Sequence, residues 1–415
     1  MAIIKPFRGY RPPSNLVEQI ASKPYDVMNR AEAKEMAADN DISFLRITRP
    51  EIEFENSVSP YAPEIYQRAK ENFVKFVETG ALVQDENACY YIYRLVMGKI
   101  DQTGIVCVCG IDDYWNDVIK KHEYTRPVKE TDRITNIKVS GIQPGPVFSA
   151  YKQRAEVDEF VGLFKKEKSP VYDFRSEDDV SHQVWVVDNA DEVDQLEGLL
   201  KEIPSVYIAD GHHRAASGAK VGKELRALNP DRNDAPYNYF LSVLFPHDQL
   251  SILDYNRVVK DLNGNSEEEF IAALEQVFTI TNKGAEAYKP TTLRSFGMYI
   301  GGSWYELKLK EAYDEKEDPV ERLDISLLDK HILKPLLDIQ DQRTDKRIDF
   351  VGGIRGLEGL QKRVDSGEMK VAFAIHPVSI EALFDVADSG NVMPPKSTWF
   401  EPKLRSGLFI HQIDS

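Results

Sequence analysis

Short apolar runs of strand length alternate with segments of helical spacing along almost the whole chain of 415 residues. The strand-like runs, rich in β-branched and aromatic residues, lie at 89–97, 104–111, 184–187, 206–209, 239–245 and 371–375. Helices are expected at 62–79, before the first of these runs, and between later runs at 190–202, 266–277 and 325–336. Strands that alternate with helices are typical of an α/β or α+β fold with mixed sheets.

The chain is too long for one ordinary core, so we expect two regions. The pattern of apolar and polar residues changes after about residue 257, and we therefore place the boundary near residue 250. Residues 1–250 are predicted to form the larger region. Residues 251–415 are predicted to form a smaller C-terminal α/β unit whose last strand returns to the first region.

Charge and cysteine content limit the classes of function. The chain has 52 basic and 68 acidic residues, a net charge of −16, which argues against a nucleic-acid partner but leaves a local anion pocket open. Three cysteines, Cys89, Cys107 and Cys109, cannot build a disulfide scaffold and are expected to be buried thiols. No run approaches the roughly 18 apolar residues of a membrane span. We therefore expect a cytoplasmic protein without a membrane partner.

The strongest local signal for chemistry is the segment Asp210-Gly211-His212-His213-Arg214, which follows the apolar run at 206–209 directly. A strand that passes through one glycine into a helix presents free N–H groups and a partial positive charge to an anion. Gly211 would let a phosphate approach the backbone, and His212, His213 and Arg214 would add donors. Asp210 is a candidate Mg²⁺ ligand. The alternative interpretation is an N-cap aspartate followed by surface histidines.

A second candidate segment runs from Lys121 to Arg133. Pro127 suits the first turn of a helix, on which Lys129 and Arg133 share one face. The residues expected to bind phosphate or nucleotide here are His122, Thr125, Arg126, Lys129 and Arg133. Glu123 is a candidate general base, and the absence of a second histidine at the required spacing argues against a zinc-protease motif. The alternative is a solvated helix face with internal ion pairs.

Three weaker segments add candidates. Lys396 and Ser397 follow two prolines and could meet a phosphate, although the glycine framework of a P-loop is absent and an edge strand is the alternative. Asp26 lies in the rigid turn Pro24-Tyr25-Asp26-Val27 and offers one carboxylate. Residues 44–49 alternate in polarity and are predicted to form a half-buried strand.

Five motifs occur in a characteristic order: Pro24-Tyr25-Asp26-Val27, residues 44–50, the block at 122–133, Asp210-Gly211-His212-His213-Arg214, and Pro395-Lys396-Ser397-Thr398. Together they resemble the bacterial and archaeal family known as domain of unknown function 1015, over nearly the whole chain. The Asp-Gly-His-His-Arg turn alone is similar to the phosphate-contacting turn of the ParB/sulfiredoxin superfamily, which includes free-serine kinases. This second resemblance implies a ParB/sulfiredoxin-like nucleotide-binding core in residues 1–250.

The resemblance implies a kinase that uses ATP or ADP with Mg²⁺ and phosphorylates a small hydroxylated metabolite, free L-serine among the candidates. In this hypothesis Glu123 or Asp26 accepts the substrate proton, Asp210 helps to hold Mg²⁺, and His212 and His213 stabilise the transferred group. The phosphate-binding residues would be Gly211, Arg214, His122, Thr125, Arg126, Lys129, Arg133, Lys396 and Ser397. Two alternatives stay open, a nucleotide or phosphomonoester hydrolase and a non-catalytic nucleotide-binding regulator. A homodimer stays open as well.

Overall fold

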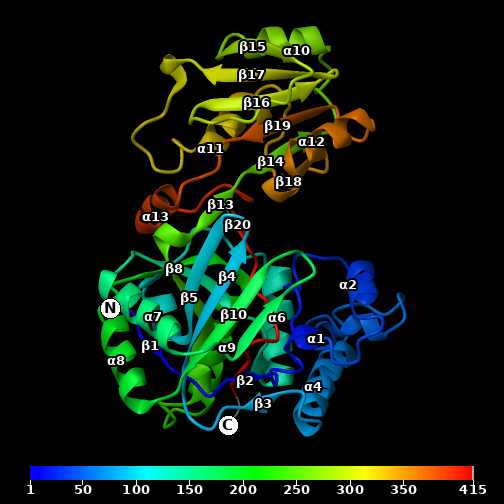
Figure 1. The fold of residues 1–415 in the computed structure, drawn as a ribbon. Coiled ribbons are helices and arrows are strands. Elements are labelled where there is room, and N and C mark those ends of the chain that lie inside the picture. Colours follow the sequence, from blue (N-terminus) through cyan, green and yellow to red (C-terminus); the bar gives the residue numbers. More distant parts are fainter. Residues whose placement is uncertain (414–415) are drawn as a thin grey trace. The chain divides into compact units, whose positions relative to one another are not determined.

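The computed structural model describes residues 1–413 and divides the chain into two compact units. The first unit consists of Met1–Leu250 together with the end of the chain from Pro402, and the second consists of Ser251–Glu401. Each unit combines helices with sheet (Figure 1). The predicted α/β class with several sheets is confirmed.

The described part of the first unit is built on a nine-stranded sheet. Most neighbouring strands are antiparallel, but β6 (Ile119–Lys120) is parallel to β11 (Val206–Asp210), and β8 (Val147–Tyr151) is parallel to β12 (Tyr239–Pro246). The order is β6-β11-β8-β12-β5-β4-β10-β9, with β1 also on β5. The remaining bounds are β1 (Ile4–Lys5), β4 (Tyr90–Met97), β5 (Ile100–Gly110), β9 (Tyr172–Arg175) and β10 (Ser181–Val187).

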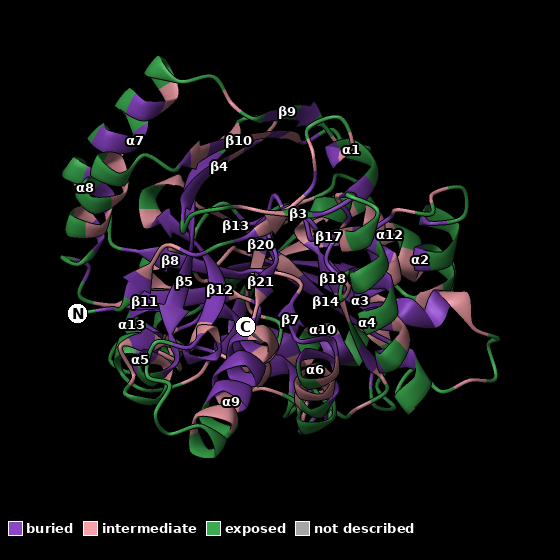
Figure 2. Cartoon of the chain, turned by 90° about the horizontal axis from the view of Figure 1, so that it is seen from below, coloured by how far each residue is buried: buried purple, intermediate pink, exposed green. Residues whose placement is uncertain are grey.

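Two helices with apolar inner faces, α7 (Ala155–Glu167) and α8 (Ala190–Leu200), pack on this sheet. Phe160, Phe164 and Leu196 join strand residues in the largest core, and Figure 2 shows the exposed outer faces of both helices. A second pair, α6 (Pro127–Ser140) and α9 (His212–Leu228), packs together through a smaller core. The short helix α5 (Ile111–Trp115) follows β5.

The N-terminal part of the first unit is helical, and this includes the segment 44–49 that was predicted to be a strand. Its elements are α1 (Val17–Ile20), α2 (Arg30–Met36), α3 (Leu45–Thr48), η1 (Pro50–Glu53) and α4 (Pro63–Glu78). The strand predicted at 44–49 is therefore wrong. Phe44 and Ile47 are three residues apart, a spacing that places both on one face of a helical turn, and they share a core with Phe73 and Phe76 of α4.

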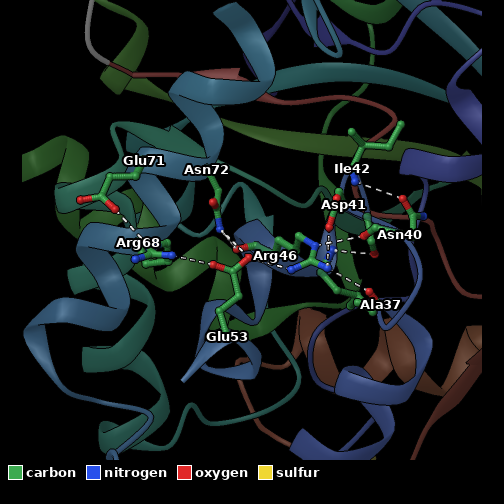
Figure 3. A network of polar contacts seen from close by, with 11 residues as sticks. Ala37, Asn40, Asp41, Ile42, Arg46, Glu53, Arg68, Glu71 and Asn72 are labelled. Carbon is green, nitrogen blue, oxygen red and sulfur yellow. Dashed lines mark hydrogen bonds and ion pairs between the residues drawn. The ribbon is translucent and has the colours of Figure 1, made fainter. Parts of the chain in front are cut away.

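Arg46 fixes this helical turn by contacts that a strand could not offer (Figure 3). Its Nη1 lies 3.0 Å from Oε1 of Glu53, and its Nε donates to the Asn40 carbonyl at 3.0 Å. The Arg46 carbonyl in turn accepts a hydrogen bond from Nδ2 of Asn72, at 2.8 Å. These contacts tie α3 to η1, α4 and the loop after α2.

The second unit contains a six-stranded antiparallel sheet in the order β15-β17-β16-β19-β14-β18. Its strands are β14 (Tyr255–Val259), β15 (Phe278–Gly284), β16 (Ser295–Ile300), β17 (Ser303–Leu309), β18 (Ile348–Gly352) and β19 (Val371–Ile375). Leu360 of α12 (Gly356–Asp365) packs on this sheet. The other elements are β13 (Ser251–Leu253), paired with β20 (Trp399–Glu401), and α10 (Glu267–Leu274), α11 (Asp324–Leu328) and α13 (Ile380–Asp388).

The end of the chain is built into the first unit by backbone pairing. Ser406 exchanges hydrogen bonds with Ser22, and Ile410 does so with Tyr10, all between 2.9 and 3.0 Å. The strand β21 (His411–Gln412) then pairs with β7 (Ile142–Gln143), while β2 (Tyr10–Arg11) pairs with β3 (Val83–Gln84). Residues more than 300 positions from the N-terminal segments thus complete the same unit. No helix within residues 1–413 is both long and apolar enough to cross a membrane.

The close contact between α9 and the turn η2 (Pro236–Asn238) allows the packing to be tested by substitution of a glycine. A Cβ atom on Gly222 would lie 2.1 Å from the Tyr237 carbonyl oxygen, whereas one on Gly162 in α7 would meet nothing within 4 Å. We predict that Gly222→Ala lowers the free energy of unfolding by about 2 kcal/mol. Gly162→Ala should raise it by up to about 1 kcal/mol. Urea unfolding of the full chain measures both, and equal stability of the two variants would contradict the packing described.

Candidate anion-binding site

The centre of the site is the single residue that joins β11 to α9. Gly211 has φ +94° and ψ 31°, a left-handed conformation that residues with a side chain rarely adopt. A Cβ atom here would also lie 2.8 Å from Nε of Arg214. Glycine is therefore required for backbone conformation and for space, and the predicted strand, glycine turn and helix are present in the structure.

Asp210 at the end of β11 forms an ion pair that the sequence did not suggest. Its Oδ2 lies 2.9 Å from Nζ of Lys403, which belongs to the C-terminal segment of the same unit. Burial raises the pKa of Asp210, but the charges of Lys403 and Arg214 outweigh burial and hold the pKa below its ordinary value. Asp210 is therefore ionised at neutral pH and keeps Lys403 beside the turn.

Two buried histidines meet edge to face next to this turn. The rings of His122 and His212 have centroids 4.5 Å apart at 88°, and Nε2 of His212 accepts a weak 3.4 Å hydrogen bond from the His122 N–H. Burial lowers the pKa of His212 to about 4 and lowers that of His122 well below its ordinary value. Both imidazoles are neutral at pH 7. They can donate or accept hydrogen bonds to a ligand but cannot supply positive charge.

His213 points toward the segment before α6. Its Nε2 accepts a 2.9 Å hydrogen bond from the backbone N–H of Arg126, so its proton is on Nδ1 in the neutral form. Burial lowers the pKa of His213, whereas the charges of Glu123 and Asp26 act to raise it. Both candidate bases therefore lie near enough to His213 to influence its ionisation.

Arg133 is held on α6 by charge and by stacking. Its Nε and Nη2 donate to Oδ2 of Asp132 at 3.1 and 2.8 Å, and its guanidinium carbon lies 4.1 Å from the ring centroid of Tyr25. Tyr66 donates to the other Asp132 oxygen at 2.9 Å. Burial opposes the charge on Arg133, but the interaction with Tyr25 and Asp132 raises its pKa above the ordinary value. Arg133 is therefore a fixed cation.

Other predicted phosphate-binding residues already have protein partners. The Thr125 hydroxyl donates to Oε2 of Glu130 at 2.7 Å, and Nζ of Lys129 lies 3.2 Å from the Tyr61 hydroxyl. Lys396 and Ser397 belong to the second unit, where Nζ of Lys396 lies 5.7 Å from the ring centroid of Tyr255 and Ser397 donates to the Pro394 carbonyl. Their predicted contact with phosphate stays a prediction.

Sequence reasoning did not identify Lys403 as a site residue. Lys403 is 193 positions from Asp210, and neither composition nor local spacing distinguishes it from Lys396. The only available signal was the short distance along the chain between the Pro395-Lys396-Ser397-Thr398 motif and the final strand.

The residues around Asp210 do not fit a magnesium site built by the protein. One carboxylate is available at the turn, and its Oδ2 is paired with Lys403 while the Arg214 charge acts on the same group. Within residues 1–413 no group of three or more His, Cys, Asp or Glu side chains could hold a metal ion. Mg²⁺ usually requires oxygen ligands in near-octahedral geometry, which the cations next to Asp210 oppose.

Comparison with known proteins identifies one family. The model of the family described as "Protein of unknown function (DUF1015)" matches residues 4–326. No curated protein matches the chain.

Several solved structures are similar at low identity. "Free serine kinase in complex with AMP" is 15% identical with a TM-score of 0.34, covering 72% of this chain and 86% of that one. "Conserved hypothetical protein from Pyrococcus furiosus" is 17% identical with a TM-score of 0.34, covering 72% and 90%. "SbnI with C-terminal truncation from Staphylococcus aureus" is 12% identical with a TM-score of 0.36, covering 72% and 85%. At such scores these likenesses carry no argument about chemistry.

The Asp210–Lys403 pair can be tested by a double-mutant cycle. We predict that Lys403→Met and Asp210→Asn each lower the free energy of unfolding by about 1–2 kcal/mol, because either change removes the opposite charge that lies 2.9 Å away. The double variant should lose less than the sum of the two single variants. Urea unfolding at pH 7 measures the coupling, and strictly additive losses would show that the ion pair contributes nothing.

The buried histidines predict a pH dependence of stability. His212 and His411 are both buried, and burial lowers each pKa to about 4. An unfolded imidazole, with a pKa of about 6.5, takes up its proton first, so acidification favours the unfolded chain between pH 6.5 and 4. We predict that the free energy of unfolding falls over this range, by at most about 3 kcal/mol per histidine.

The control for this prediction is a substitution that involves no titratable group. His411→Gln should reduce the slope of stability against pH between 6.5 and 4.5, whereas Gln249→Asn, a change that involves no titratable group, should leave it unchanged. Urea unfolding at four pH values measures the slope. An unchanged slope in His411→Gln would contradict the neutral state of that side chain.

Proposed function

The chain belongs to the DUF1015 family, and from that premise we propose that it is a nucleotide-dependent phosphotransferase that phosphorylates a small hydroxylated metabolite, with free L-serine as one candidate. The observation that carries the proposal is the arrangement at Gly211. There the start of a 17-residue helix, the guanidinium of Arg214 and the ammonium group of Lys403 lie beside one turn. Such an arrangement favours a ligand with several negative charges.

The donor side of the proposed reaction uses this turn. The first N–H groups of a helix have no partner inside the helix and carry partial positive charge, so those at the start of α9 can bind phosphate oxygens. Arg214 and Lys403 supply formal charge, while the neutral His212 and His213 supply hydrogen bonds only. ATP or ADP is the proposed donor.

The acceptor side uses a carboxylate. In the transfer step the acceptor hydroxyl oxygen forms a bond to the terminal phosphorus, and the bond from phosphorus to the bridging oxygen breaks. The electron pair of that bond stays with the nucleotide, and the hydroxyl proton passes to Glu123 or Asp26. These two carboxylates are proposed because both act on His213 at the helix start.

The proposal is tested by incubating the full chain with ATP or ADP, Mg²⁺ and a pool of hydroxylated metabolites that includes L-serine. Mass spectrometry should detect one acceptor that has gained a phosphoryl group. Release of inorganic phosphate whatever acceptor is present would instead identify a nucleotide hydrolase. Tight nucleotide binding without any product over hours would identify a regulatory protein.

Isosteric variants test the role of the two carboxylates. We predict that one of the two variants, Glu123→Gln or Asp26→Asn, lowers the turnover number by about 10²–10³-fold. In that variant no group accepts the proton of the acceptor hydroxyl. Glu159→Gln, on the exposed face of α7, is the matched control and should turn over like the wild type. Wild-type turnover in both Glu123→Gln and Asp26→Asn would refute the assignment of the base.

A further inference from the structure

A small pocket lies beside the start of α9, against α6 and the loop that joins β7 to β8, entirely within the first unit. Its volume is about 30 Å³. A water molecule needs about 10–15 Å³ by the same measure, so the pocket holds roughly two waters, or a group of three heavy atoms. Its polar lining consists of Tyr25, Thr48, Arg133, Asn136, Gln143, Arg214 and Ser406.

Two polar groups of the lining residues make no hydrogen bond within residues 1–413. Asn136 is 3% exposed, and within residues 1–413 its side-chain amide makes no hydrogen bond. The Nε atom of Arg214 is also buried and without a partner, since the guanidinium donates from Nη1, to the Pro146 carbonyl. Buried polar atoms in folded proteins nearly always have hydrogen-bond partners. The Asn136 amide, which lines the pocket, therefore has a donor free for a ligand that accepts hydrogen bonds.

Two arginines line the pocket, whereas the carboxylates that act on them, Asp132 on Arg133 and Asp26 and Asp210 on Arg214, are not part of the lining. Within the described residues Arg214 forms no ion pair, and the Nη1 group of Arg133 makes no hydrogen bond because its contact with Asp132 uses Nε and Nη2. The remaining walls are apolar and include Ile137, Val147 and Leu241. A planar carboxylate matches this size and these donors, whereas a phosphate needs more space and more donors.

We propose that this pocket binds the carboxylate of the acceptor substrate, so that the acceptor is a small hydroxy acid or hydroxy amino acid. The identification of this ligand as the phosphoryl acceptor rests on the proposed function, whereas the binding of a carboxylate in the pocket does not. Arg214 links the two sites, because its guanidinium packs against Gly211 and also lines the pocket. A carboxylate held there keeps the rest of a small molecule near the helix start at which the donor phosphates are proposed to bind.

The test is a calorimetric titration of the full chain with glycolate, L-lactate and L-serine, and with glycolamide as the uncharged counterpart of glycolate. At least one carboxylate should bind at least tenfold more tightly than glycolamide. Asn136→Asp keeps the shape of the side chain but adds a negative charge inside the pocket, and should weaken carboxylate binding at least tenfold. Thr131→Asp adds the same charge on the exposed face of α6 and should bind as the wild type does.

Titration with ADP provides the second readout, because Asn136 is not among the groups proposed to bind phosphate. Asn136→Leu removes the amide without placing a charge beside Arg214, so it should bind ADP as the wild type does while its affinity for carboxylates falls. Three results would each overturn the proposal: no carboxylate binds, glycolamide binds as tightly as glycolate, or Asn136→Asp binds carboxylates undiminished. Carboxylate binding without any phosphoryl transfer would keep the pocket as a carboxylate site and refute the proposed function.

Discussion

The site depends on one backbone conformation, the left-handed Gly211 between β11 and α9. Because this residue can adopt φ +94° and leaves space for the guanidinium of Arg214, the strand ends and the helix begins without a loop between them. Consecutive side chains therefore leave the turn in different directions. They reach partners from separate segments: Lys403, the His122 N–H, the Arg126 N–H and the Pro146 carbonyl.

The turn is positively charged although the protein has a net charge of −16, because arginine and lysine carry the charge there. The ordinary pKa values of arginine and lysine lie far above 7, so partial burial next to Asp210 leaves them charged. Imidazole has an ordinary pKa near neutrality, and burial is sufficient to discharge it, as at His212. Sequence reasoning expected the two histidines to add hydrogen-bond donors and to stabilise the transferred group, and burial restricts them to hydrogen bonding without charge.

Local patterns predicted elements well where the pattern and the packing agree. The runs at 206–209 and 371–375 became β11 and β19, and the helix expected after Pro127 became α6. The segment at 44–49 failed because its polarity fits a strand and a helical turn alike. Contacts of Phe44 and Ile47 with α4, and of Arg46 with Glu53, decided in favour of the helix. Such contacts join residues that no local window contains.

The sequence by itself determined the glycine turn, the identity of its donors and the family, because these depend on neighbouring residues and on motif order. Only the tertiary structure decided that Lys403 pairs with Asp210, that His122 meets His212, and that Arg133, Asn136 and Arg214 line one pocket. The physical reason is that these groups come from segments far apart along the chain. Their protonation, and the absence of a partner for Asn136 within residues 1–413, follow from burial that only the packed unit creates.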